Sequence, residues 1–247
     1  MTTRDLATAD GKRWSADGLR LGGVVAFSTV DYPGQLAATV FLQGCPWRCH
    51  YCHNPHLIPR RADVEAPVWA DVRRLLQRRQ HRLEAVVFSG GEPLSQRGLA
   101  AAMAEVQQLG FRVGLHTGAP DADRLQRLLP WLDWVGLDIK ALPAGYPAIT
   151  SSRSSGPASW RALSLLLQHG IGFECRTTWH PELHSAADII ELGASLAQQG
   201  VTSYAVQPAG TDQCLNPMLA RRRPGPAEQE QVVQALAPLF ESFHLRS

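Results

Sequence analysis

Three cysteines stand close together in the sequence, where their side chains could share a metal. Cys45, Cys49 and Cys52 follow the pattern C-x3-C-x2-C. Thiolates are soft ligands that favour iron–sulfur clusters, zinc or copper. A four-iron cluster normally takes four thiolates, so three would leave one iron open, and an open metal position is typical of catalysis. A zinc site completed by His50 or His53 is the alternative that the residue types allow, although zinc ligands usually come in two separated pairs.

The stretches around this motif predict the framework that would hold it. Six short segments are rich in apolar, β-branched or aromatic residues and are bounded by glycine or proline, as strands commonly are. We expect β-strands over residues 38–43, 84–89, 111–117, 133–139, 171–179 and 202–208.

The stretches between these strands predict helices. One begins near Pro67, since proline suits the first helical turn, and another covers Ser95–Leu109. A third begins at Ser185, with Asp188 as its capping-box partner, and a fourth follows Pro226. Glycine supplies the left-handed cap that ends a helix, and three glycines stand just before predicted strands: Gly110, Gly170 and Gly200.

This alternation predicts the α/β fold class. Repeated strand–helix units imply parallel strands with right-handed crossovers, and six of them favour a partial (β/α)6 TIM-like barrel in a single domain. Residues 1–18 are polar and aperiodic, so they predict a flexible N-terminal tail, and one domain would cover residues 19–247.

Every predicted strand delivers polar residues to its carboxyl end, which is where parallel barrels carry their chemistry. The cysteine motif directly follows the first strand. Asp138 and Lys140 alternate along one strand, so both would face the interior; an ordinary ion pair is the alternative. Lys140 is one of only two lysines in the chain, which favours a specific role. Arg176 is suited to a carboxylate, or is structural.

Composition and charge exclude several other classes. The chain has 247 residues and a net charge of only +2, which argues against a broad nucleic-acid surface. No apolar run approaches the roughly 20 residues of a membrane helix. The first residues lack the order of a secretory signal, and five cysteines are a poor disulfide framework. We therefore expect a cytoplasmic protein that binds neither membrane nor nucleic acid.

The sequence resembles the radical S-adenosylmethionine (SAM) superfamily. An aromatic residue, Tyr51, precedes the last cysteine of the motif, and Gly-Gly-Glu at 90–92 ends the second strand; both are hallmarks of that superfamily. The closer resemblance is to activating enzymes of glycyl radical enzymes, above all those of anaerobic ribonucleoside-triphosphate reductase. It is carried by DYPG (31–34), GCPWRCHYCHNP (44–55), FSGGEPL (88–94), GLDIK (136–140) and RTT (176–178).

This resemblance implies a 4Fe-4S cluster on Cys45, Cys49 and Cys52, with SAM bound at the open iron. An electron from the reduced cluster would cleave SAM to methionine and a 5′-deoxyadenosyl radical, which removes a hydrogen atom from the substrate. The protein would position and shield this chemistry. Tyr51 would contact the adenine, and His53 would lie beside it.

The resemblance also assigns the polar residues at the other strand ends. The backbone at Gly90 and Gly91 would hold the methionine ammonium, and Glu92 would fix the turn or add complementary charge. Thr117 ends the third strand. The remaining contacts implied are Asp138 and Lys140 with the ribose, the carboxylate or a cation, Arg176 with the methionine carboxylate, and Gln207 with the ribose.

One position departs from the family pattern. Related activases often carry an acidic residue at the end of the third strand, where this chain has His116. A cation beside the cofactor is therefore either missing or replaced by the charge of His116. Cys175 is expected to pack against a helix, and Cys214 to be exposed.

The resemblance implies a partner protein as substrate. This would be a glycyl radical enzyme, in the first place anaerobic ribonucleoside-triphosphate reductase, with a flavodoxin- or ferredoxin-type electron donor. The alternatives are an activase of another such enzyme, for example pyruvate formate-lyase, or an enzyme acting on a nucleotide precursor, like 7-carboxy-7-deazaguanine synthase. A zinc-stabilised binding protein without catalysis is a further alternative.

Overall fold

The computed structural model describes residues 14–210, 214–219 and 222–246. Its eight strands form one sheet in the order of the chain. They are β1 (Leu21–Ser28), β2 (Ala37–Leu42), β3 (Ala85–Gly90), β4 (Arg112–Thr117), β5 (Trp134–Asp138), β6 (Gly172–Trp179), β7 (Ser203–Pro208) and β8 (Ser242–Leu245). The first pair, β1 and β2, is antiparallel, whereas β2–β3, β3–β4, β6–β7 and β7–β8 are parallel.

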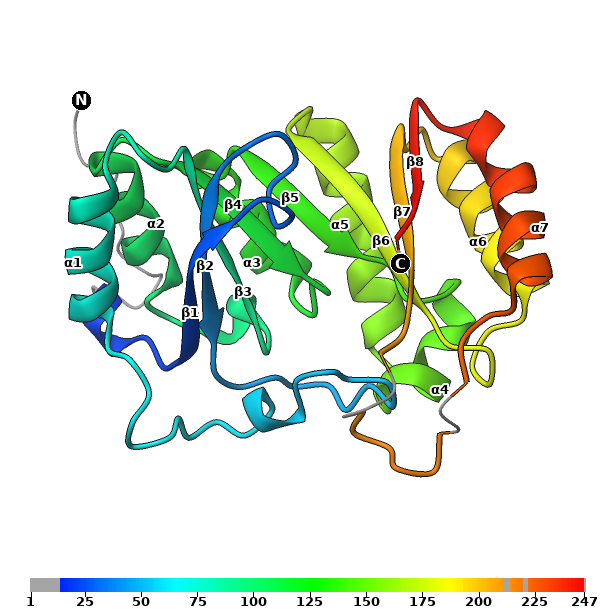
Figure 1. Cartoon of the computed structure of the whole chain (residues 1–247), viewed down its shortest axis with the longest axis horizontal. Helices are drawn as coiled ribbons and strands as arrows, with labels where there is room; N and C mark the ends of the chain where they lie inside the picture. Colours follow the sequence, from blue (N-terminus) through cyan, green and yellow to red (C-terminus); the bar gives the residue numbers. More distant parts are fainter. Residues whose placement is uncertain (1–13, 211–213, 220–221, 247) are drawn as a thin grey trace. The chain divides into compact units, whose positions relative to one another are not determined.

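The helices follow the strands in alternation, as the sequence predicts (Figure 1). They are α1 (Trp69–Arg79), α2 (Leu99–Gln108), α3 (Ala122–Leu128), α4 (Tyr146–Thr150), α5 (Ser155–His169), α6 (Ala186–Gln198) and α7 (Pro226–Leu236). Within the described ranges, none of them has the length and apolarity that a bilayer crossing needs.

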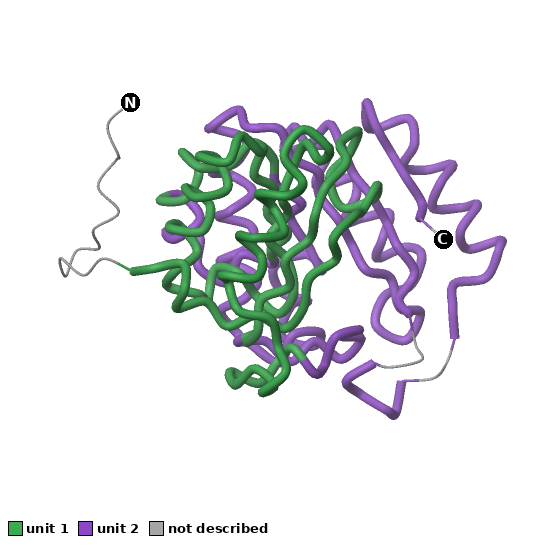
Figure 2. Tube along the Cα trace, turned by 60° about the vertical axis from the view of Figure 1, so that its left-hand side comes forward, with its two compact units in different colours: residues 1–45, 57–117, 127–134 green, residues 46–56, 118–126, 135–247 purple. Residues whose placement is uncertain are grey.

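Contacts divide the chain into two compact units, which are coloured separately in Figure 2. Unit 1 comprises residues 1–45, 57–117 and 127–134, and unit 2 comprises residues 46–56, 118–126 and 135–247. The cysteine motif is divided between them, because Cys45 ends the first segment of unit 1 and Cys49 and Cys52 belong to unit 2.

Unit 1 is built on β1–β4, with α1 and α2 beside one another (Figure 1). All residues of β2 except Phe41 are buried, and the first four of β3 are fully buried, the apolar continuity expected of parallel strands covered on both faces. Trp69 of α1 stacks on Phe88 of β3 at 6.0 Å between ring centroids. Its indole also donates to Glu105 of α2 at 2.8 Å, so the two helices are fixed to each other.

Unit 2 holds β6–β8 together with α4–α7, and α6 and α7 run side by side (Figure 1). A Cβ atom added at Gly193 of α6 would lie 2.6 Å from the Leu236 side chain of α7, so this glycine permits the close helix contact. Tyr204 of β7 packs on Phe240 and Phe243 at 5.2 and 5.9 Å.

The six predicted strands are all present, with each end shifted by at most one residue, and the α/β fold class is confirmed. The three predicted cap glycines, Gly110, Gly170 and Gly200, all have positive φ. Ser185 caps α6 through the predicted capping box with Asp188.

The structure adds β1 and β8, which the sequence does not reveal. β1 contains two glycines and is half-exposed, and β8 has only four residues, so neither shows a clear strand pattern. β1 and β8 do not pair with each other among the described residues, and the barrel is not closed. Of the expected tail, residues 1–13 lie outside the described residues, but Ala16–Gly18 form a 3-10 turn in which Ala16 is buried.

Candidate functional site

The first half of the cysteine loop is anchored within unit 1. Gly44 has φ +101°, which favours glycine, and its N–H donates to the Leu57 carbonyl at 2.7 Å. The Cys45 N–H donates to the Ile58 carbonyl at 3.1 Å. The buried Gln96 amide binds the Gln43 carbonyl at 2.6 Å, so the exit from β2 has a fixed direction.

The second half of the loop lies in unit 2 and is bonded on both sides. The His50 N–H donates to the Ile149 carbonyl at 3.0 Å, and the His50 carbonyl accepts from the Asn216 N–H at 2.9 Å. The Cys52 carbonyl accepts from the Leu215 N–H at 3.2 Å. These contacts use backbone groups and leave the thiols of Cys49 and Cys52 available to a metal. Among the described residues, none of the three motif cysteines is part of a disulfide, and all three are partly exposed.

The two imidazoles of the loop are engaged elsewhere, which weakens the zinc alternative. His53 Nε2 accepts from the Gly210 N–H at 2.7 Å. His50 Nδ1 lies 3.2 Å from the side-chain amide of Asn216. One ring nitrogen of each histidine is therefore already used. Within the described residues, no group of three or more histidine, cysteine, aspartate or glutamate side chains comes together in the arrangement of a metal site.

Lys140 lies over the two aromatic rings of the cysteine loop. Its ammonium is 5.9 Å from the Trp47 ring centroid and 5.8 Å from that of Tyr51, within the range of a cation–π contact. It also pairs with Asp138 at 3.1 Å. Burial acts to lower the pKa of Lys140, but Asp138 and other acidic groups outweigh it and hold the pKa well above its ordinary value. The buried ammonium is therefore charged.

The charge of Lys140 acts on the two thiols of unit 2. Burial raises the pKa of Cys49 and of Cys52, and the Lys140 ammonium opposes the rise at both. Metal binding requires the thiolate and releases its proton. A fixed cation beside these ligands therefore favours metal loading.

Tyr51 and Arg176 are both buried. The Tyr51 hydroxyl has no hydrogen-bond partner among the described residues, and burial raises its pKa. Arg176 donates from Nε to Glu174 at 2.7 Å, and Glu174 also accepts from Arg246 at 2.7 Å. Arg176 thus belongs to a buried ion cluster, which sequence reasoning did not foresee.

Gln207 lies opposite Thr178 in the parallel pairing of β7 with β6. Its side chain is partly exposed. This register puts Gln207 on the same face of the sheet as Thr178 and therefore, by alternation, as Arg176.

The glycine pair at 90–91 permits a close approach of backbones within unit 1. A Cβ atom at Gly90 would lie 2.4 Å from the Leu42 nitrogen, and one at Gly91 would lie 2.6 Å from the Gly44 carbonyl oxygen. No residue with a side chain fits at either position. The pair therefore locks the end of β3 against the start of the cysteine loop.

Glu92 fixes the turn that follows, one of the two roles expected for it. It is buried, and one carboxylate oxygen accepts from the Leu94 N–H at 2.9 Å and from the Thr117 hydroxyl at 2.7 Å. The ends of β3 and β4 are thus joined. His116 binds the Asp31 carbonyl through Nε2 at 2.7 Å.

Several residues at the site were not predicted from the sequence. Trp47 contributes a ring beside Lys140, and Tyr146 and His184 bind the Lys140 main chain. Trp47 stands inside the cysteine motif, which was a usable signal. Nothing in the local sequence marks the other two. Cys175 is buried, as predicted, whereas Cys214 is only partly exposed and binds the Asn216 carbonyl.

Comparison with known proteins now identifies the family. The profile of the radical SAM superfamily matches residues 39–192. The chain belongs to the radical SAM superfamily. This range contains the cysteine motif and the first five of the predicted strands, and it makes the chain a member of an enzyme superfamily that uses SAM and a 4Fe-4S cluster.

Two curated relatives carry names of activating enzymes. "Putative glycyl-radical enzyme activating enzyme MJ1227" of Methanocaldococcus jannaschii is 27% identical over 76% of this chain and 78% of its own length. The pyruvate formate-lyase-activating enzyme of Clostridium pasteurianum is 31% identical over 56% of this chain and 59% of its own length. The chain is thus similar to this class, and it spans less than two thirds of the second relative.

Solved structures show the same fold at low sequence identity. Streptococcus suis SuiB has a TM-score of 0.64 at 14% identity and covers 83% of this chain, which spans 47% of SuiB. The structure titled "Native anSMEcpe with bound AdoMet" has a TM-score of 0.62, also at 14% identity, over 83% of this chain and 62% of its own.

The residues present fit the cofactors of the superfamily. The motif offers three cysteines that are not in disulfides among the described residues, and Tyr51 offers a buried hydroxyl without a hydrogen-bond partner there. Soft thiolates suit iron–sulfur clusters.

Proposed function

We propose that this chain is the activating enzyme of a glycyl radical enzyme and removes a hydrogen atom from a glycine Cα of its partner. The observation that carries the proposal is the backbone-bonded loop of unit 2 that presents the thiols of Cys49 and Cys52 beside the buried ammonium of Lys140. The names of the relatives, which cover up to 76% of the chain, supply the reaction class.

Cys45, Cys49 and Cys52 would hold a 4Fe-4S cluster, and SAM would complete its coordination. When bound and reduced, this cluster supplies the electron that cleaves SAM to methionine and a 5′-deoxyadenosyl radical. The protein's share is to hold the cofactors and exclude water. The burial of Tyr51 and Lys140 supports that share.

The other residues would bind SAM through groups they already present. Lys140 and Asp138 would meet the ribose, and Tyr51 would meet the adenine with His53 beside it. Arg176 would bind the carboxylate through the part of its guanidinium that Glu174 does not occupy.

The remaining contacts would come from strand ends. Gly90, Gly91 and Thr117 would line the methionine end, with Glu92 holding their turn. Gln207 would reach the ribose from the sheet face that it shares with Arg176.

The first partner proposed is anaerobic ribonucleoside-triphosphate reductase, with a flavodoxin or ferredoxin as electron donor. The motif segments GCPWRCHYCHNP and GLDIK favour it. A second candidate is pyruvate formate-lyase, and the 31% identity to the Clostridium activating enzyme favours that one.

The test is to incubate the anaerobically reconstituted protein with SAM, dithionite and each purified candidate partner. A glycyl radical gives an electron paramagnetic resonance doublet on the partner. We expect the doublet with one partner, and 5′-deoxyadenosine formed alongside it. A protein that cleaves SAM but gives no doublet with any glycyl radical enzyme would contradict the proposal and favour a small-molecule substrate.

C175A is the matched control for the cluster ligands. Cys175 is buried and does not belong to the cysteine motif. C175A should therefore keep the doublet, whereas C49A should abolish it.

A further inference from the structure

The main chain of Lys140 is held by two buried side chains. β5 ends at Asp138, and Ile139 still donates to the Arg176 carbonyl at 2.9 Å. At Lys140, side chains take the place of the neighbouring strand as hydrogen-bond partners of the main chain. The Lys140 N–H donates to the Tyr146 hydroxyl at 3.0 Å, and the Lys140 carbonyl lies 2.8 Å from His184 Nε2.

The tautomer of His184 follows from this contact. A carbonyl oxygen can only accept, so Nε2 carries the proton. Nδ1 then has a lone pair, and it has no hydrogen-bond partner among the described residues. The ring therefore has one hydrogen-bond donor, the Nε2–H group, and it donates to the Lys140 carbonyl.

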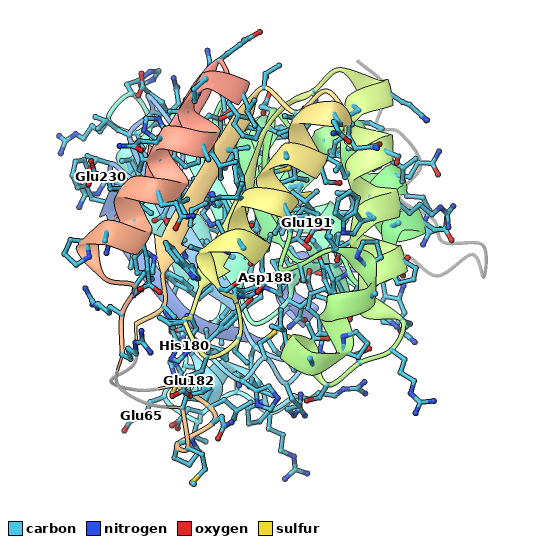
Figure 3. The ribbon with its side chains drawn as sticks, turned by 90° about the vertical axis from the view of Figure 1, so that its right-hand side faces the viewer. Glu65, His180, Glu182, Asp188, Glu191 and Glu230 are labelled. Atoms are coloured by element: carbon cyan, nitrogen blue, oxygen red, sulfur yellow. The ribbon has the colours of Figure 1, made fainter. Side chains whose placement is uncertain are left out.

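The main chain of His184 is itself held within the connection between β6 and α6, whose neighbouring residues His180 and Asp188 are labelled in Figure 3. The His184 carbonyl accepts from the Trp179 indole at 3.0 Å, and its N–H donates to the His180 carbonyl at 2.9 Å. Ser185, the next residue, caps α6. His184 therefore links the main chain of Lys140 to the turn at residues 179–184.

We infer that His184 is a positioning residue that sets where the Lys140 ammonium lies over the rings of Trp47 and Tyr51. The inference rests on the proposed function, because it assumes that Lys140 contacts bound SAM. Without the imidazole donor, a buried carbonyl would lose its partner, which disfavours the present backbone conformation. The ammonium on the same residue would then move relative to the cysteine loop.

The main experiment is a double-mutant cycle on SAM affinity, measured by equilibrium dialysis with the cluster-loaded protein. We expect H184L to weaken SAM binding about tenfold. H184Q keeps an N–H donor of similar reach, so it should restore affinity to within about twofold. In a K140M background, H184L should change affinity by no more than about twofold, because its effect passes through Lys140.

S185A is the matched control for general loosening of this segment. It removes the cap of α6 beside His184 without touching Lys140, so it should lower the melting temperature and leave SAM affinity unchanged. Equal weakening by H184L in both backgrounds would overturn the inference. So would equal weakening by H184L and S185A at matched loss of stability.

A second measurement needs neither the cofactors nor a variant. Nitrogen-15 NMR of the iron-free, histidine-labelled protein should show the Nε2–H tautomer for His184. The Nδ1–H tautomer would overturn the inference even if H184L failed to fold. If the double-mutant cycle gives the expected SAM affinities but no partner shows the glycyl radical doublet, the proposed function alone is overturned. A K140M protein that binds SAM as well as the natural chain would overturn the assumption about Lys140, and the inference with it.

Discussion

Glu174 is a buried carboxylate that two arginines share. It is 3% exposed, and one of its oxygens accepts from both Arg176 and Arg246. The negative charge of this carboxylate offsets the positive charges of the two guanidiniums. Removing one partner of a buried ion pair commonly lowers the free energy of unfolding by about 3–5 kcal/mol, because the remaining charge is left uncompensated.

We therefore expect E174Q to lower the free energy of unfolding by about 3 kcal/mol, measured by urea denaturation. D123N is the control, because Asp123 pairs with Arg161 on the exposed surface, where an ion pair is worth at most about 1 kcal/mol. Similar losses for the two variants would show that Glu174 does not hold the cluster of arginines together.

His184 makes stability depend on pH. Burial lowers its pKa from the ordinary value of 6.5, since the charged ring would lose water. The unfolded chain takes up this proton below pH about 6.5, while the folded chain resists it. The stabilising contribution of the neutral His184 ring to the free energy of unfolding is therefore complete above pH about 6.5 and is lost as the pH falls.

Urea titrations from pH 8 to pH 5 would measure this dependence. The natural chain should lose more stability below pH 6.5 than H184Q, which has no ring to titrate. Above pH 7.5, the unfolding free energies of the two proteins should change with pH in parallel. Parallel curves over the whole range would mean that His184 titrates alike in both states.

At the scale of elements, helix ends carry information that can be read directly from the sequence. The glycines at 110, 170 and 200 end helices with positive φ, and Ser185 with Asp188 begins one. These signals are local, so no knowledge of the fold is needed to use them. β1 gave no such signal, because a strand with two glycines takes its form from its pairing with β2.

Gly170 gives a clean test of this reasoning. It has φ +73° and a Cβ atom there would meet nothing within 4 Å, so G170A changes backbone strain alone. We expect it to cost about 1 kcal/mol of unfolding free energy. G23A is the control: its Cβ would also meet nothing, and its φ is not positive. A loss in G23A as large as in G170A would contradict the strain argument.

At the scale of the whole molecule, the sequence predicts the alternation of strands and helices, which the structure confirms. It also offers the thiols, the glycine pair and the strand-end residues as candidates for the site, because each is tied to a spacing or to a strand end. The partners of Lys140 could not be found. Tyr146 and His184 reach it from segments 6 and 44 residues further along the chain, and only the folded chain brings them together.

The metal content of the folded protein should depend on three of its five cysteines. Replacing Cys45, Cys49 or Cys52 by alanine should abolish the brown colour of about four irons per chain. C175A and C214A should retain it, because neither residue belongs to the motif. Colorimetric iron analysis after anaerobic reconstitution measures this, and a full complement of iron in C49A would refute the assigned ligand set.

Several of the hydrogen bonds that shape residues 46–53 run between backbone groups, among them those of His50 and Cys52. Their strength therefore does not depend on whether iron is present. We expect a protein whose cluster has been destroyed by oxygen to lose its colour while the cysteine loop keeps its backbone conformation. Reconstitution with iron and sulfide should therefore restore the visible absorbance of the same protein after each of several rounds of cluster loss.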